Sequence, residues 1–190
     1  MKVNLKRFYD LLNGLINLVI PKTRKGDYLF SLLHFLRVFK RFPRNKFLLN
    51  DYLFHRKLSD DALSPLRGYV TDKVWVKDYI KLKVGEDHAI PNLAVFDRVE
   101  AFNSYKMPDS CCIKPAHASG EYILRKHGEA IDEELIRSWF KLNYYKSWRE
   151  INYRYLPPRV IVEPLIFNSA NLIDYKAYCF NGAVKFFQAI

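Results

Sequence analysis

The feature that most restricts the fold of this chain is a strand–loop–strand pattern in its middle. Residues 110–114 form an apolar run that predicts a strand ending at Lys114, residues 115–121 are mostly small, and residues 122–126 predict a second strand. Small side chains let backbone N–H groups approach phosphate oxygens, and a lysine at the strand end adds a point charge. By itself, the pattern is more typical of a surface hairpin with a solvated lysine.

Several motifs that would point to other chemistry are absent. Neither a Walker A loop nor a GxGxxG turn occurs, and there is no GxSxG elbow that would make Ser119 a nucleophile. We therefore expect His117 to be a hydrogen-bonding loop residue rather than a catalyst. No CxxC or HExxH motif is present, so no metal site is predicted, and Cys111 and Cys112 are expected to be buried in a strand.

The apolar periodicity predicts helices over about a third of the chain. The expected helices cover residues 3–20, 27–42, 71–82 and 132–145, and residues 44–70 are mixed. Asp27 is the expected N-cap of the second helix, and Gly85 is placed to end the third.

The remaining elements are strands. Residues 90–96 and 160–162 are expected to be further strands, and residues 175–189 are expected to form a hairpin whose Asn181-Gly182 pair favours a type I′ turn. Helices and hairpins mixed in this way predict an α+β fold, with N-terminal helices followed by antiparallel sheets. We divide the chain into a basic helical region, residues 1–60, and a second region, residues 61–190.

Positive charge is concentrated at the start of the chain. Residues 1–60 hold 13 of the 31 Lys and Arg but only four of the 20 Asp and Glu. Such a segment suits an acidic polymer, an anionic membrane surface or nucleic acid, although a solvated basic face explains it equally well. The apolar residues 11–20 are too few and too interrupted to span a membrane, so we expect a cytoplasmic protein that touches the inner membrane face at most.

Two further stretches could line a binding site. Glu163 and Pro164 follow the run at residues 160–162, where backbone groups that leave a sheet could pair with an adenine edge. Asp174 and Lys176 enter the hairpin, where Asp174 could accept from a ribose hydroxyl and Lys176 could meet a phosphate. A plain strand exit and an exposed ion pair are the alternative readings.

Taken together, five segments resemble the teichuronopeptide-biosynthesis (TupA-like) branch of the ATP-grasp superfamily. Residues 71–80 resemble its D-K-x-x-V-R-x-Y-V helix, residues 113–120 its L-K-P-N-H-G-S-G loop, and residues 143–153 its N-Y-Y…R-E-x-x-Y run. Glu163 matches a strand-ending glutamate, and residues 174–182 resemble a D-Y-K…F-N-G hairpin. The segments occur in the family's order and cover roughly residues 60–190.

This resemblance implies that ATP is held between two α+β subdomains, that a carboxylate is activated as an acyl phosphate and that an amine attacks it. The acceptor would be an acidic surface polysaccharide or its precursor, and nucleic acid is not the expected partner. The matched positions implied to contact ATP are Lys114, His117, Ser119, Gly120, Glu163, Pro164, Leu165, Ile166, Asp174 and Lys176.

The chain also departs from the family pattern. Ala118 stands where the family has glycine, and Glu121 stands near a position that is usually small. The resemblance implies Mg²⁺, but its ligands belong to a second sheet that we expect this chain to lack, as a fragment or truncated reading frame. Two other hypotheses remain: a polysaccharide-cluster glycosyltransferase, for which no DxD motif is visible, and a non-catalytic protein that binds anionic surfaces.

Overall fold

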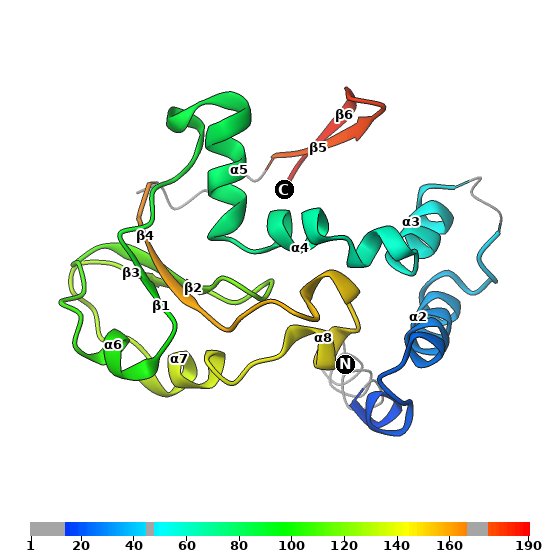
Figure 1. Cartoon of the computed structure of the whole chain (residues 1–190), viewed down its shortest axis with the longest axis horizontal. Helices are drawn as coiled ribbons and strands as arrows, with labels where there is room; N and C mark the ends of the chain where they lie inside the picture. Colours follow the sequence, from blue (N-terminus) through cyan, green and yellow to red (C-terminus); the bar gives the residue numbers. More distant parts are fainter. Residues whose placement is uncertain (1–13, 45–47, 167–174) are drawn as a thin grey trace.

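The computed structural model describes residues 14–44, 48–166 and 175–190, and it combines helices with two antiparallel sheets. In Figure 1 the helices α2 and α3 lie at one end, and a four-stranded sheet flanked by helices lies at the other. The predicted α+β class is therefore confirmed. None of the described helices is both long and apolar enough to cross a membrane.

The first part of the described chain is helical. Residues 14–19 are followed by α2 (Arg24–Phe39), α3 (Leu49–Lys57), η1 (Asp60–Leu63) and α4 (Pro65–Thr71). Thr23, not Asp27, is the N-cap of α2, since the Thr23 side chain accepts from the Gly26 N–H. The prediction for Asp27 was wrong because its carboxylate is buried within the first turn, against a partner far away in the sequence.

The two later helices also begin or end differently from the prediction. The helix predicted over residues 71–82 is α5 (Trp75–Val84), and Asp72 accepts from the N–H groups of Val74 and Trp75 ahead of it. Gly85 ends α5 with a φ of 103°, as predicted. The helix predicted over 132–145 is split into α7 (Glu133–Trp139) and α8 (Tyr144–Trp148), because Asn143 caps a new helix by accepting from the Lys146 N–H.

The four-stranded sheet is antiparallel in the order β1-β4-β2-β3. Its strands are β1 (Ala94–Phe96), β2 (Cys111–Pro115), β3 (Ile123–Arg125) and β4 (Val160–Pro164). One face packs against α6 (Val99–Asn103) and α7 to form the core, in which Ile113 and Val162 are fully buried beside Phe102 and Trp139. Strand alternation turns Cys112 and Lys114 to the opposite face.

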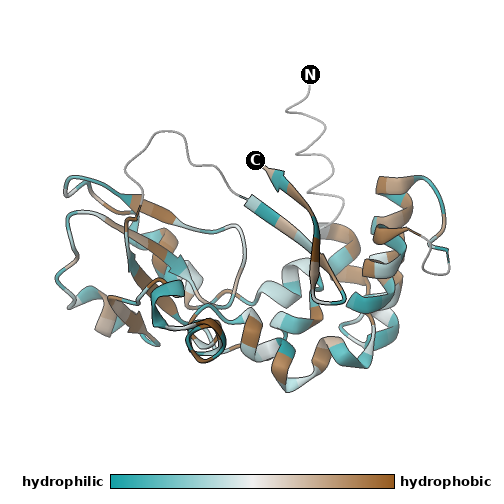
Figure 2. Ribbon diagram, turned by 90° about the horizontal axis from the view of Figure 1, so that it is seen from above, coloured by the Kyte–Doolittle hydropathy of each residue, from teal (hydrophilic) through white to brown (hydrophobic). Residues whose placement is uncertain are grey.

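The second sheet is the hairpin of β5 (Tyr175–Phe180) and β6 (Ala183–Ala189). Asn181 and Gly182 both have positive φ, 50° and 78°, which confirms the predicted type I′ geometry. Figure 2 shows the hairpin standing apart from the four-stranded sheet, and every residue of β6 is exposed.

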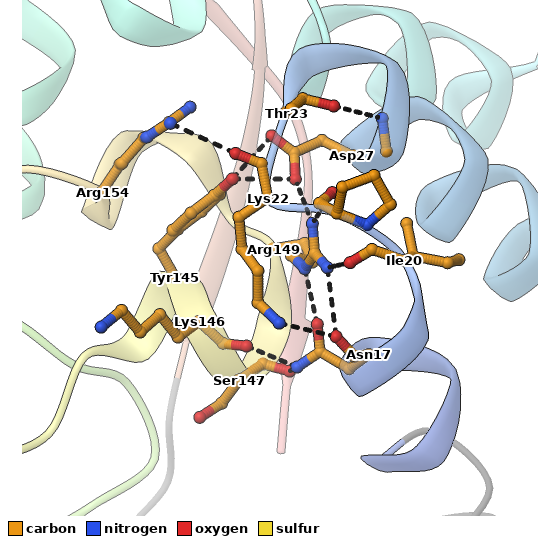
Figure 3. Close-up of polar contacts among 12 residues, drawn as sticks. Asn17, Ile20, Lys22, Thr23, Asp27, Tyr145, Lys146, Ser147, Arg149 and Arg154 are labelled. Atoms are coloured by element: carbon orange, nitrogen blue, oxygen red, sulfur yellow. Dashed lines mark hydrogen bonds and ion pairs between the residues drawn. The ribbon is translucent and has the colours of Figure 1, made fainter.

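A buried ion pair joins the helical region to the rest of the chain (Figure 3). The Arg149 guanidinium lies 2.8 Å from the Asp27 carboxylate, and both side chains are almost fully buried. Arg149 also donates to the carbonyls of Pro21 and Ile20 at the end of the first helix, while the Tyr145 hydroxyl donates to Asp27 at 2.9 Å. One arginine therefore holds three elements together.

We predict that Arg149→Met destabilises the protein by about 3 to 5 kcal/mol, because it leaves the Asp27 carboxylate buried without its cation. Urea unfolding followed by circular dichroism measures the change. The matched control is Arg137→Met. The ion pair of Arg137 with Glu133 is exposed, so its loss should lower the free energy of unfolding by less than about 1 kcal/mol. Equal effects of the two substitutions would contradict the role given to Arg149.

Candidate functional site: a lysine cluster beside a small-residue loop

Lys114 projects from the face of the sheet opposite the core. It is the fourth residue of β2, whose burial alternates, and its side chain is 22% exposed. Cys112 lies on the same face and is paired in register with Glu163 of β4. The strands therefore bring a lysine from one segment beside a carboxylate from another, 49 positions along the chain.

Glu163 is the centre of the cluster. Its carboxylate is nearly buried and lies 2.5 Å from the Lys114 ammonium and 2.5 Å from the Lys77 ammonium of α5. Lys77 also donates to the Asn92 side chain. Burial raises the pKa of the Cys112 thiol, so at pH 7 this neighbour adds no negative charge. A single carboxylate thus serves two ammonium groups.

Lys73 holds the loop that follows β2. Its ammonium donates to the carbonyl of Pro115 at 2.8 Å and to that of Ala118, and its N–H donates to the carbonyl of Ala116 at 3.1 Å. Burial, together with the nearby Lys114 charge, lowers the pKa of Lys73 to about 8. The shift comes mainly from removal of the ammonium from water, and the Lys114 charge adds to it.

His117 anchors the same loop from inside the protein. Its Nδ1 accepts from the Arg159 N–H at 3.1 Å, so its Nε2 carries the hydrogen and donates to the Leu142 carbonyl at 3.2 Å. Burial lowers the pKa of His117, which keeps the ring neutral. The expectation of a hydrogen-bonding loop histidine agrees with this geometry, in which both ring nitrogens face the protein backbone.

Ser119 and Gly120 form the exposed tip of the loop. Gly120 has a φ of 83°, and a Cβ placed there would meet no other atom, so glycine is needed for the backbone conformation rather than for space. The Ser119 side chain interacts with the hydroxyls of Tyr144 and Tyr153, whose rings lie 4.5 Å apart. Burial raises the pKa of Tyr144 to about 12, so its hydroxyl stays protonated.

The other predicted site residues lie at varying distances from this cluster. Glu163 and Pro164 end β4, and Leu165 and Ile166 leave the sheet half-buried and exposed, respectively. Lys176 lies on the exposed hairpin, paired in register with Gln188. In the part of the chain that the structure describes, the ion pairs of Glu163 come from Lys77 and Lys114, not Lys176. Asp174 lies outside the described residues.

Sequence reasoning gave no role to four residues that build the site. Lys73 lies just before α5 and Lys77 lies in its first turn, and the resemblance of residues 71–80 to the family's helix was the sequence signal that could have found them. Asp72 and Arg159 form a buried ion pair at 2.8 Å, and the Arg159 guanidinium lies over the Trp75 ring. This pair fixes the start of α5 against the segment that precedes β4.

A comparison with protein-family models identifies the family. The model described as TupA-like ATPgrasp matches residues 52–189. The chain belongs to this family. Neither the curated proteins nor the solved structures that were compared gave a match.

Membership of the TupA-like ATP-grasp family implies ATP binding and confirms the resemblance drawn from the five segments. The two departures from the family pattern are accommodated. Ala118 is fully buried and presents its carbonyl to Lys73, and Glu121 is exposed to solvent. Among residues 14–44, 48–166 and 175–190, no group of three or more His, Cys, Asp or Glu is placed to hold a metal ion.

We predict that Lys73 makes the protein more stable at alkaline pH. Its folded pKa of about 8 lies below the ordinary value of 10.5, so between these values the unfolded chain binds more protons and stability rises with pH. Between pH 7.5 and 9.5 the wild type should gain roughly 1 to 2 kcal/mol relative to Lys73→Met in urea unfolding. The control is Lys106→Met, whose stability should change with pH as that of the wild type does. If the stability of Lys73→Met also changes with pH in parallel with the wild type, the assignment is excluded.

Proposed function

We propose that the lysine cluster binds the phosphates of ATP and that the protein is an ATP-dependent carboxylate–amine ligase of cell-surface polysaccharide synthesis. The observation that carries this proposal is that the Lys77 and Lys114 ammonium groups share the single carboxylate of Glu163, while the Lys73 ammonium, which feels the charges of both Lys114 and Glu163, holds the loop whose exposed tip is Ser119 and Gly120. Such an excess of positive charge suits a polyanion. Membership of the ATP-grasp family supports ATP as that polyanion.

Each residue has a distinct part in the proposed site. Lys114 is the phosphate-contacting side chain, because it is partly exposed and sits on the open face of β2. Glu163 is a positioning residue, since it fixes both Lys77 and Lys114. Ser119 and Gly120 form the loop tip that would close over the phosphates, while His117 and Lys73 hold its base.

The adenine and ribose would lie at the end of β4. The segment from Glu163 to Ile166 leaves the sheet there, so its backbone groups are the proposed hinge for the adenine edge. Asp174 and Lys176 remain the proposed contacts to ribose and phosphate. When bound, ATP supplies the phosphoryl group that activates a carboxylate for attack by an amine.

Mg²⁺ does not fit the residues described here. The Glu163 carboxylate is already engaged by two lysines, and the described part of the chain groups no further acidic ligands around it. The proposed site therefore includes no metal ion.

The proposed acceptor is an acidic surface polysaccharide or its precursor, and the proposed location is the cytoplasm, at or near the inner membrane face. The support is the basic composition of residues 1–60, which hold 13 Lys or Arg against four Asp or Glu. Positive charge raises the local concentration of an acidic polymer and speeds its encounter.

We predict that Lys114→Ala weakens ATP binding by about tenfold or more, because a charge-assisted contact to phosphate is lost. Isothermal titration calorimetry of wild type and variant, with and without Mg²⁺, measures the change. Lys106→Ala is the matched control, since Lys106 is an exposed lysine outside the cluster.

The same titration can refute the proposal. Circular dichroism must first show that Lys114→Ala is folded, because the substitution also removes one partner of Glu163. A folded Lys114→Ala variant that binds ATP as tightly as wild type, or a wild type that binds no ATP, would rule out the assignment of Lys114.

A further inference from the structure

A second candidate site lies in the helical region, away from the lysine cluster. It is a cavity of about 330 Å³ lined by residues of α2, α3 and α8; Figure 1 shows α2 and α3 at one end of the molecule and α8 nearer its middle. Its walls are mostly aromatic, with Phe30, Phe35 and Phe54 at the back and Trp148 at the rim. Phe35 and Phe54 meet edge to face at 5.4 Å, so this wall is a packed aromatic surface.

Ser31 supplies an unsatisfied polar group to this cavity. The residue is only 6% exposed and lines the cavity, and its hydroxyl has no hydrogen-bond partner. A buried hydroxyl without a partner costs free energy, which a polar group of a bound ligand would recover. His34, on the same wall, adds no charge, because burial and Arg37 lower its pKa below the ordinary value.

Two opposite charges face the same cavity without pairing. Lys57 of α3 and Glu150, which follows α8, both line it, and both also line an adjoining cavity of about 510 Å³. Among the ion pairs of the described residues, neither group appears, so the ammonium and the carboxylate lie more than 4.0 Å apart. Burial lowers the pKa of Lys57; the charges of Glu150 and Asp27 partly oppose this shift, and a bound carboxylate would oppose it further.

We propose that this cavity binds a zwitterionic α-amino acid with an apolar or aromatic side chain. The carboxylate of the ligand meets Lys57, its ammonium meets Glu150, and its side chain lies against Phe30, Phe35 and Phe54. The α-carbon of such a ligand carries an ammonium group, a carboxylate group and an apolar side chain. It therefore matches a separated lysine–glutamate pair above an aromatic wall.

The site does not depend on the proposed ATP function. Glu150 follows Arg149 directly, and it is electrostatically coupled to Tyr144 and Tyr153, the residues that contact Ser119 of the loop. The cavity and the loop thus share the segment around residues 144–153. Binding of the amino acid is nevertheless measured without ATP, so failure of one proposal leaves the other intact.

The test uses three ligands that share a phenyl group and differ in the charged groups that they carry. L-phenylalanine carries both charges, phenethylamine lacks the carboxylate, and 3-phenylpropionate lacks the ammonium. Titration calorimetry or ligand-observed NMR on the full chain should show L-phenylalanine binding about tenfold or more tightly than either analogue, since each lost contact is charge-assisted.

Matched variants assign each contact. Lys57→Met should weaken the binding of L-phenylalanine by about tenfold or more and leave the binding of phenethylamine unchanged. Glu150→Gln should likewise weaken the binding of L-phenylalanine, but it should leave the binding of 3-phenylpropionate unchanged. Lys83→Met, an exposed lysine on α5, is the control, and thermal melts check folding.

Three results would overturn the proposal. The first is that L-phenylalanine does not bind the folded wild type, and the second is that it binds no more tightly than its singly charged analogues. The third is that folded Lys57→Met and Glu150→Gln bind all three ligands as tightly as wild type does. Each of these outcomes would show that the cavity is an aromatic gap between helices rather than an amino-acid site.

Discussion

The sharing of one buried carboxylate by two lysines is the interaction on which the candidate site depends. Glu163 lies almost out of contact with water and is held at 2.5 Å from both Lys77 and Lys114. A buried glutamate without cations is costly, and two lysines without an anion repel each other. The arrangement therefore fixes helix α5 against the sheet and leaves net positive charge on the face that carries Lys114, which is where we propose that the phosphates bind.

A second buried pair ties the flanking helices to this site. Arg149 and Asp27 join segments that lie 122 positions apart in the sequence. Arg149 directly follows α8, which contacts the Ser119 loop through Tyr144, and it directly precedes Glu150, which faces the aromatic cavity. The basic N-terminal helices are thus bound to the segment that contacts the Ser119 loop. The division of the chain into residues 1–60 and residues 61–190 remains a prediction, and the loss of Arg149 is the substitution that probes it most sharply.

The sequence predicted what local patterns determine. The strand that carries Lys114, the type I′ hairpin and the glycine that ends α5 all follow from neighbouring residues, and all are confirmed. Long-range contacts were not accessible in the same way. Asp27 has the chemistry of an N-cap, yet Arg149 draws it into the interior, and Lys77 becomes a partner of Glu163 only after α5 packs on the sheet. The break between α7 and α8 was missed because the cap of Asn143 competes with an unbroken apolar stripe.

The most direct test of the account is to measure how ATP changes the chemical reactivity of individual lysines. Acylation with a limiting reagent at pH 8, followed by mass spectrometry, reads Lys73, Lys77, Lys114 and the exposed Lys106 in one experiment. The account predicts that saturating ATP protects Lys114 most strongly, protects Lys73 and Lys77 as well, and leaves Lys106 unchanged. Reactivity of Lys114 that is the same with and without bound ATP would contradict the proposal that the cluster around Glu163 holds the phosphates.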